Sequence, residues 1–131
     1  APQPTPMYVH PGHLLRLADG RILLVYGLRN PGLWGVAGRL SEDEGQSWSR
    51  PFILVNLGAQ ADCGYPSSVQ LADGTIVTAY YASRIEQHQR YHMGVVRCRL
   101  DEVGKRHWHP RGRLGRIRAP GFSLDYERQH E

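Results

Sequence analysis

Short apolar runs follow one another along the chain, and turn-forming residues interrupt them every few positions. The runs are roughly five to nine residues long, are rich in Val, Ile, Leu and Tyr, and are broken by Gly. Such runs are typical of β-strands, whereas a helix would need a longer periodic stretch without the glycines. We therefore predict an all-β protein.

One four-residue sequence occurs twice, as Leu17-Ala18-Asp19-Gly20 and as Leu71-Ala72-Asp73-Gly74, and the residue numbers differ by 54 (71 − 17). Both copies lie between apolar runs, and Asp-Gly in that setting indicates the tight turn of a β-hairpin because both residues adopt positive φ readily. A third run follows each hairpin, at 34–40 and at 92–100. Each unit is therefore predicted to be four antiparallel strands, the arrangement of a propeller blade.

The repeat divides the chain into four parts: a Pro-rich lead-in at 1–10, one blade at 11–60, a second blade at 61–110, and a basic tail at 111–131. Two such blades cannot close a propeller, because their edge strands stay unpaired. We expect either a piece of a larger propeller or three copies that assemble into a ring. The start at Ala1, without a Met or a signal peptide, favours the first alternative, a part of a larger propeller.

The net charge of +4 comes from one end of the chain. Residues 1–104 carry nine basic and nine acidic side chains, while residues 105–131 carry seven basic and three acidic ones, which gives the whole +4 (7 − 3). The arginines at 111–118 have no aromatic side chain between them, and aromatic side chains are typical of proteins that stack on single-stranded nucleic acid. A specific nucleic-acid partner is therefore not expected.

Composition argues against several other classes of protein. No apolar run approaches the ~18 residues of a membrane-spanning helix. The two cysteines, Cys63 and Cys98, have neither metal-ligand spacing nor the number needed for a disulfide scaffold. We expect no membrane span, no metal site and no cofactor.

The residues from Ser41 to Trp48 form the most specific motif, which reads S-x-D-x-G-x-[ST]-W. Ser41 and Asp43 can bond to backbone groups of a turn that no strand satisfies. Gly45 supplies the positive φ that the reversal needs, and Trp48 offers an apolar face that anchors the turn against the sheet. A generic acidic turn before a Trp is the alternative interpretation.

This motif is the Asp-box, and the chain resembles the sialidase or BNR-repeat family of six-bladed β-propellers. Residues 14–21, 26–29 and 64–69 extend the resemblance, which covers roughly residues 11–100. The resemblance implies that the chain is about two blades from the C-terminal part of such a propeller. It also implies that the box residues Ser41, Asp43, Gly45 and Trp48 are structural and lie away from the active site.

A degenerate copy of the box follows the second unit. Glu102 and Gly104 match its Asp and Gly, Leu100 replaces its Ser, and Trp108 comes one residue late. We predict a hairpin turn here as well.

The resemblance implies two residues for the chemistry. Sialidases use a Tyr nucleophile, because a phenol suffers less repulsion from the substrate carboxylate than a second carboxylate would. Tyr65 stands at the family's position for that Tyr, although Pro66 follows where Ser is usual, and packing around the channel is the alternative role. Arg29 is the candidate for binding the substrate carboxylate, since guanidinium matches carboxylate with two parallel hydrogen bonds. Arg39, close to the box, is expected to point away from the site.

Two histidines complete the candidate site. His13 begins an inner strand at the position that the repeat equates with Ser67, where an imidazole can bind a hydroxyl, transfer a proton or form a structural hydrogen bond. His88 and His92 lie in a long loop that would form the rim of the site, so His88 is expected to contact substrate. A metal-binding pair of these two histidines would need a helix and is not expected.

These residues imply a fragment of a sialidase-like glycoside hydrolase, of the exo-α-sialidase type, that acts on glycans with a terminal acidic sugar. The fragment alone is expected to be inactive, because no segment matches the family's acid/base loop or its N-terminal arginine motif. The alternative is a non-catalytic carbohydrate-binding or interaction propeller. The family acts outside the cytoplasm, which implies a secreted or periplasmic protein, while the residues themselves leave the location open.

Overall fold

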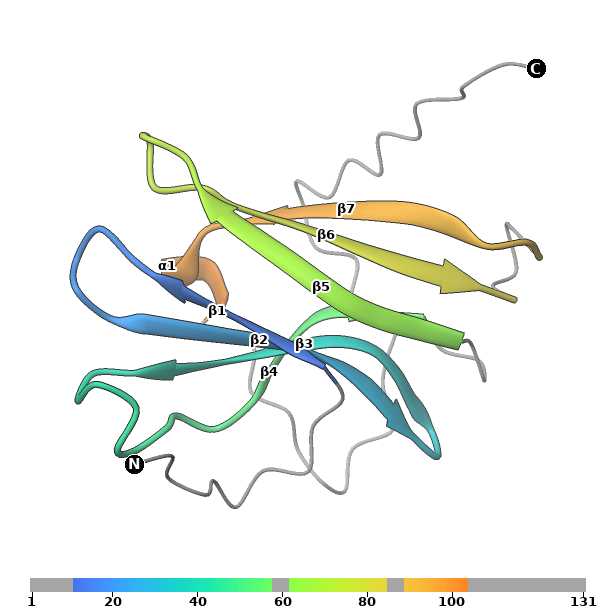
Figure 1. The fold of residues 1–131 in the computed structure, drawn as a ribbon, viewed down its shortest axis with the longest axis horizontal. Helices are drawn as coiled ribbons and strands as arrows, with labels where there is room; N and C mark the ends of the chain where they lie inside the picture. Colours follow the sequence, from blue (N-terminus) through green and yellow to red (C-terminus); the bar gives the residue numbers. More distant parts are fainter. Residues whose placement is uncertain (1–10, 58–61, 85–88, 104–131) are drawn as a thin grey trace.

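The computed structural model describes residues 11–57, 62–84 and 89–103. Within these segments seven strands form two antiparallel sheets (Figure 1), so the prediction of an all-β fold is confirmed. Sheet A is a simple meander in which each strand pairs with the next: β1 (Gly12–Arg16), β2 (Ile22–Asn30), β3 (Leu33–Ser41) and β4 (Phe52–Asn56). The first unit therefore has the four strands predicted for it.

Sheet B contains β5 (Asp62–Gln70), β6 (Ile76–Ser83) and β7 (His92–Cys98), again paired in chain order. A fourth strand was also predicted for this unit, and the residues where it would fall lie outside the described segments. A single helical turn, α1 (Leu100–Val103), follows β7. In the described part of the chain, no helix has the length and apolar character needed to cross a membrane.

The start of the degenerate Asp-box has a different secondary structure from the one predicted. A hairpin turn was expected from residue 100, whereas Leu100–Val103 is helical, and Gly104 and Trp108 lie outside the described residues. The intact box gives the physical reason. There the Ser41 hydroxyl accepts a hydrogen bond from the backbone N–H of Gly45, and Leu100 has no hydroxyl at the equivalent position.

The two hairpins have the same register, as the repeat predicts. Leu15 pairs with Leu23 in sheet A, and Val69 pairs with Val77 in sheet B, which are the same positions shifted by 54 (69 − 15). Both Asp-Gly turns also close in the same way, because Gly20 donates to the carbonyl of Leu17 and Gly74 to that of Leu71. The hairpin prediction is confirmed in both units.

The two sheets pack on each other through one face of each (Figure 1). Strand β5 lies against β1 and β2, and the hydrophobic side chains of both sheets form one buried core. Its members with less than 2% exposure include Leu23, Val25, Val36, Cys63 and Ile76. Burial of side chains of this size contributes about 1.5–3 kcal/mol each, so this interface holds the two sheets together.

Candidate functional site

The turns of both sheets gather at two opposite ends. At one end, Ile22 pairs with Ser41, which brings the first Asp-Gly turn beside the Asp-box, and the backbone N–H of Ala18 donates to Gln70 Oε1 at 2.7 Å. We call this the Asp-box end. At the other end, the C-terminal part of β2 meets the start of β5 and the end of β6. We call this the aromatic end and define it as Arg29, Asp62, Tyr65, Tyr81 and Tyr91.

The Asp-box turn is closed by its own side chains. Ser41 Oγ donates to Asp43 Oδ1 at 2.8 Å and accepts from the N–H of Gly45, also at 2.8 Å. Both the N–H and the hydroxyl of Ser47 donate to the Asp43 carboxylate. The indole of Trp48 donates to the carbonyl of Gly45, whose φ of 85° gives the reversal.

These hydrogen bonds make Asp43 a stronger acid than usual. The donors from Ser47, and then Ser41, lower the pKa of Asp43 to about 2, because they stabilise the charged carboxylate. The carboxylate oxygens are therefore occupied by the turn itself. These contacts are internal to the turn, and the structural role that the resemblance implies for Ser41, Asp43, Gly45 and Trp48 stays a prediction.

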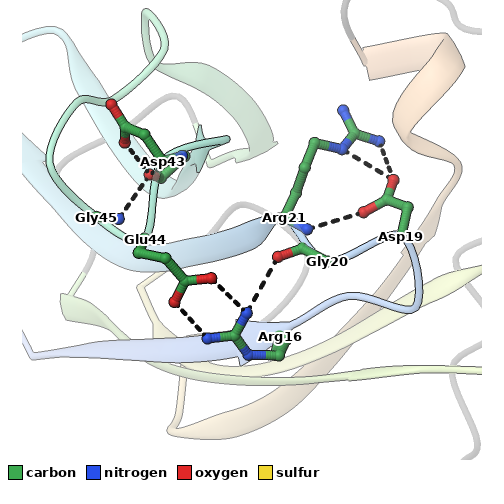
Figure 2. Close-up of polar contacts among 8 residues, drawn as sticks. Arg16, Asp19, Gly20, Arg21, Asp43, Glu44 and Gly45 are labelled. Carbon is green, nitrogen blue, oxygen red and sulfur yellow. Dashed lines mark hydrogen bonds and ion pairs between the residues drawn. The ribbon is translucent and has the colours of Figure 1, made fainter.

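Two exposed ion pairs surround this turn (Figure 2). Arg16 binds both carboxylate oxygens of Glu44 through Nη1 and Nη2, at 2.8 and 2.6 Å, and Nη1 also donates to the carbonyl of Gly20. Arg21 donates from Nε and Nη2 to one oxygen of Asp19, Oδ2, while its backbone N–H donates to Oδ1. Because the acidic groups bind arginines and turn amides, they do not form a ligand set, and no group of three or more His, Cys, Asp or Glu within the described segments could hold a metal ion.

At the aromatic end, Arg29 crosses from β2 of sheet A to sheet B. Its Nε donates to the carbonyl of Cys63 at 2.9 Å, its Nη2 donates to the hydroxyl of Tyr81, and Nη2 lies 3.0 Å from Asp62 Oδ1. The Arg29 side chain keeps 27% of its surface exposed and that of Asp62 35%, so both are partly open to solvent. The sequence predicted Arg29 as a site residue, and the structure gives it this cross-sheet position.

Asp62 is the centre of the aromatic end. Tyr81 donates to its Oδ1 at 2.8 Å and Tyr91 to its Oδ2 at 2.7 Å. The hydrogen bonds from Tyr91 and Tyr81, and the positive charge of Arg29, hold the pKa of Asp62 below its usual value. Burial, and then the hydrogen bond to Asp62, raise the pKa of Tyr81 to about 12, so its hydroxyl stays protonated at neutral pH.

Tyr65 is exposed at the aromatic end in an unusual backbone conformation. Its φ is 46°, which is rare for any residue except Gly and rarer before Pro, and 62% of its surface is exposed. It lies at a β-bulge, where the pairing of β5 with β6 shifts between Gly64 and Ser67. Pro66 has no N–H to donate to the neighbouring strand, so it interrupts the hydrogen bonding of β5. The Pro that replaces the usual Ser of the family motif therefore lies within the bulge.

The bulge turns the Tyr65 ring towards its neighbours. The ring lies 5.5 Å from that of Tyr81, which lies 6.0 Å from that of Tyr91. The hydroxyl of Tyr65 has no hydrogen bond to another described residue, and none of the described carboxylates is paired with it. Within the described segments, Tyr65 therefore presents a hydroxyl without a hydrogen bond and an exposed aromatic ring beside the Arg29–Asp62 pair.

The other predicted residues lie elsewhere. His13 is at the interface of the sheets, where its Nδ1 accepts from the N–H of Ser68 at 3.1 Å, which is the structural alternative considered for it. His88 lies outside the described residues, and Nδ1 of His92 is 3.0 Å from the carbonyl of Arg90. Arg39 donates to the carbonyl of Ser49 at the Asp-box end, away from Tyr65, as expected.

Sequence reasoning missed Asp62, Tyr81 and Tyr91 as members of this site. Neither Asp62 nor the two tyrosines were among the predicted site residues. One signal was present for Tyr81, because the repeat equates it with Gly27 (81 − 54), so a large aromatic residue replaces a glycine. In sheet A that position faces the neighbouring sheet closely, since a Cβ on Gly64 would lie 3.4 Å from the Cα of Gly27.

Comparison with known proteins assigns no family to this fold and site. No protein-family model, no curated protein and no solved structure matches the chain.

We expect the carboxylate of Asp43 to make the stability of the fold depend on pH. Because the pKa of Asp43 is lowered to about 2 on folding, its contribution is fully present above the unfolded value of about 4 and is lost as the pH falls through about 2. Asp43→Asn should therefore lower the melting temperature at pH 7, and the gap to wild type should shrink between pH 4 and pH 2.

Thermal unfolding followed by circular dichroism measures this gap. Asp101→Asn, which removes an exposed carboxylate paired only loosely with Arg99 at 3.7 Å, is the matched control and should give no such gap. A constant difference between Asp43→Asn and wild type down to pH 2 would contradict the role assigned to the carboxylate.

Proposed function

We propose that the chain forms part of a sialidase-like β-propeller and that its aromatic end binds a carbohydrate. The observation that carries the binding proposal is the presentation of Tyr65, an exposed aromatic residue with positive φ beside a partly exposed Arg–Asp pair. Non-glycine residues in such conformations cluster at functional sites, because the surrounding structure must sustain a cost of about 1–3 kcal/mol.

The packing of the two sheets supports the propeller. Leu23 and Val25 lie on the face of sheet A that sheet B covers. In the repeat they correspond to Val77 and Ala79 of sheet B, so the face of sheet B that carries Val77 and Ala79 is the equivalent face. That equivalent face is the outer face of sheet B, and it includes exposed apolar side chains: Val69 at 51%, Met93 at 67% and Val95 at 47%. An exposed apolar face of this kind is typical of an interaction surface.

A further sheet of the same repeat fits this outer face, because it would cover sheet B in the same way as sheet B covers sheet A. The sheet could belong to a longer chain or to another copy of this chain, and three copies would give six units. The Asp-box turn between β3 and β4 is the second support, because its side chains close a turn at the end of the molecule opposite Tyr65.

The chemistry of the aromatic end supports a carbohydrate as the ligand. Tyr65 and Tyr91, with 62% and 70% of their surfaces exposed, offer apolar ring faces with polar hydroxyl edges. Arg29 and Asp62 add a donor and an acceptor within the same cluster. A few convergent polar groups beside aromatic faces are what a sugar, with its apolar ring face and many hydroxyls, requires.

We expect Tyr65→Ala to weaken carbohydrate binding about tenfold or more, because it removes the exposed ring. Isothermal calorimetry with a panel of methyl glycosides, including those of galactose and N-acetylneuraminic acid, measures the change. Leu14→Ala is the matched control, since Leu14 is equally exposed at 61% but lies outside the aromatic end. Equal affinity in Tyr65→Ala and wild type would contradict the proposal.

Glycoside hydrolysis with Tyr65 as nucleophile is the second candidate. The strained backbone that aims Tyr65 outward favours it, since sialidases attack the sugar with a Tyr. A phenol needs a base to become a good nucleophile, and among the described residues no carboxylate is paired with Tyr65. Binding is for this reason the function that the geometry supports best, and hydrolysis would need groups from further blades.

The 131-residue chain alone is accordingly expected to release no fluorophore from 4-methylumbelliferyl α-sialoside above the rate in buffer. Tyr65→Phe, which keeps the ring and removes the nucleophilic oxygen, is measured beside it. Turnover by the wild type that Tyr65→Phe abolishes would establish the hydrolase and overturn the preference for binding without hydrolysis.

A further inference from the structure

The guanidinium of Arg29 is bound on one edge by sheet B and lies beside the carboxylate of Asp62. An arginine can bind a carboxylate with two parallel hydrogen bonds either through Nε and Nη2 or through Nη1 and Nη2. Here Nε donates to the carbonyl of Cys63, and Nη2 donates to Tyr81 and lies 3.0 Å from Asp62. The edge through Nε and Nη2 is therefore in use, and a ligand carboxylate at the other edge would lie beside the negative charge of Asp62, whose Oδ1 is 3.0 Å from Nη2.

Asp62 is held where it is by more than Arg29. The hydroxyls of Tyr81 and Tyr91 each donate to one of its oxygens, at 2.8 and 2.7 Å. A ligand carboxylate that displaced Asp62 would therefore break these hydrogen bonds and bring a second negative charge beside the first. Like charges at this distance repel strongly where the site is partly shielded from water.

We propose that Asp62 is a specificity-determining residue that directs the aromatic end towards uncharged sugars by occupying Arg29. The inference rests on the proposed carbohydrate binding and departs from the acidic sugar that the sequence resemblance implies. In this arrangement Arg29 holds Asp62 and the tyrosines in place, and the ligand contacts the aromatic rings and the outer atoms of the ion pair.

Among the described residues, Arg84 also acts on this cluster through its charge. It is exposed, its backbone N–H donates to the carbonyl of Gln89, and its positive charge acts on both Asp62 and Tyr91. Arg84 can give any acidic ligand a general attraction that salt would weaken. The test must therefore separate this attraction from a contact with Arg29.

The probes are the methyl α-glycoside of N-acetylneuraminic acid and the methyl ester of the same compound, which differ only in the charge of the carboxyl group. The ratio of their dissociation constants, from calorimetry or NMR titration, reports the preference for the acid. We expect Asp62→Asn to raise the preference for the acid about tenfold, because it removes the negative charge that neutralises Arg29 and repels a ligand carboxylate. Arg84→Gln should lower the preference in both backgrounds alike.

The double variant Arg29→Gln/Asp62→Asn keeps the charge of the cluster unchanged and should keep the wild-type ratio. This variant serves as an independent test if Asp62→Asn does not fold. An unchanged ratio in folded Asp62→Asn, or a strong preference for the acid in wild type that the double variant loses, would overturn the inference. Failure of wild type to bind any methyl glycoside of the panel, these two probes included, would instead overturn the carbohydrate proposal itself, and the inference with it.

Discussion

The packing of sheet B on sheet A is the constraint on which the aromatic end depends. Arg29 comes from β2, while Asp62, Tyr65 and Tyr81 come from β5 and β6, and the buried core between the sheets fixes their distances. Polar contacts cross the same interface, from Arg29 to the carbonyl of Cys63 and from Ser68 to His13. A change that loosens the core would therefore separate Arg29 from Asp62 before it disrupted β2 or β5 themselves.

The two ends of the molecule use similar side chains differently. At the Asp-box end, the carboxylate of Asp43 is bound by Ser41 and Ser47 within the same turn, so its hydrogen bonds fix local backbone. At the aromatic end, Asp62 is bound by residues of both sheets, and its oxygens remain partly exposed. The first arrangement stabilises a fold, whereas the second leaves a polar centre surrounded by open aromatic rings, as ligand recognition requires.

The features predictable from the sequence are those that local residues determine. The Asp-Gly hairpins and the Asp-box turn depend on neighbours within a few positions, so their residue patterns were sufficient. The surroundings of Arg29 depend on which strand of sheet B faces it, and no local pattern contains that information. Asp62 was not predicted as a site residue for this reason. The replacement of Gly27 by Tyr81 at the equivalent position of the repeat was a sign in the sequence that the contact between the sheets is altered there. Family resemblance pointed to Tyr65 but not to its bulge, because the positive φ follows from the pairing of β5 with β6.

The most direct test of ligand binding at the aromatic end locates the ligand on the folded chain. In an NMR titration of the labelled 131-residue protein with a methyl glycoside that binds, we expect shift changes to centre on Arg29, Asp62, Tyr65, Tyr81 and Tyr91. The Asp-box residues from Ser41 to Trp48 should not shift, because their polar groups bind one another at the opposite end. Shifts that centred on the Asp-box end, or that left Tyr65 and Tyr91 unchanged at saturation, would contradict the assignment of the aromatic end as the binding site.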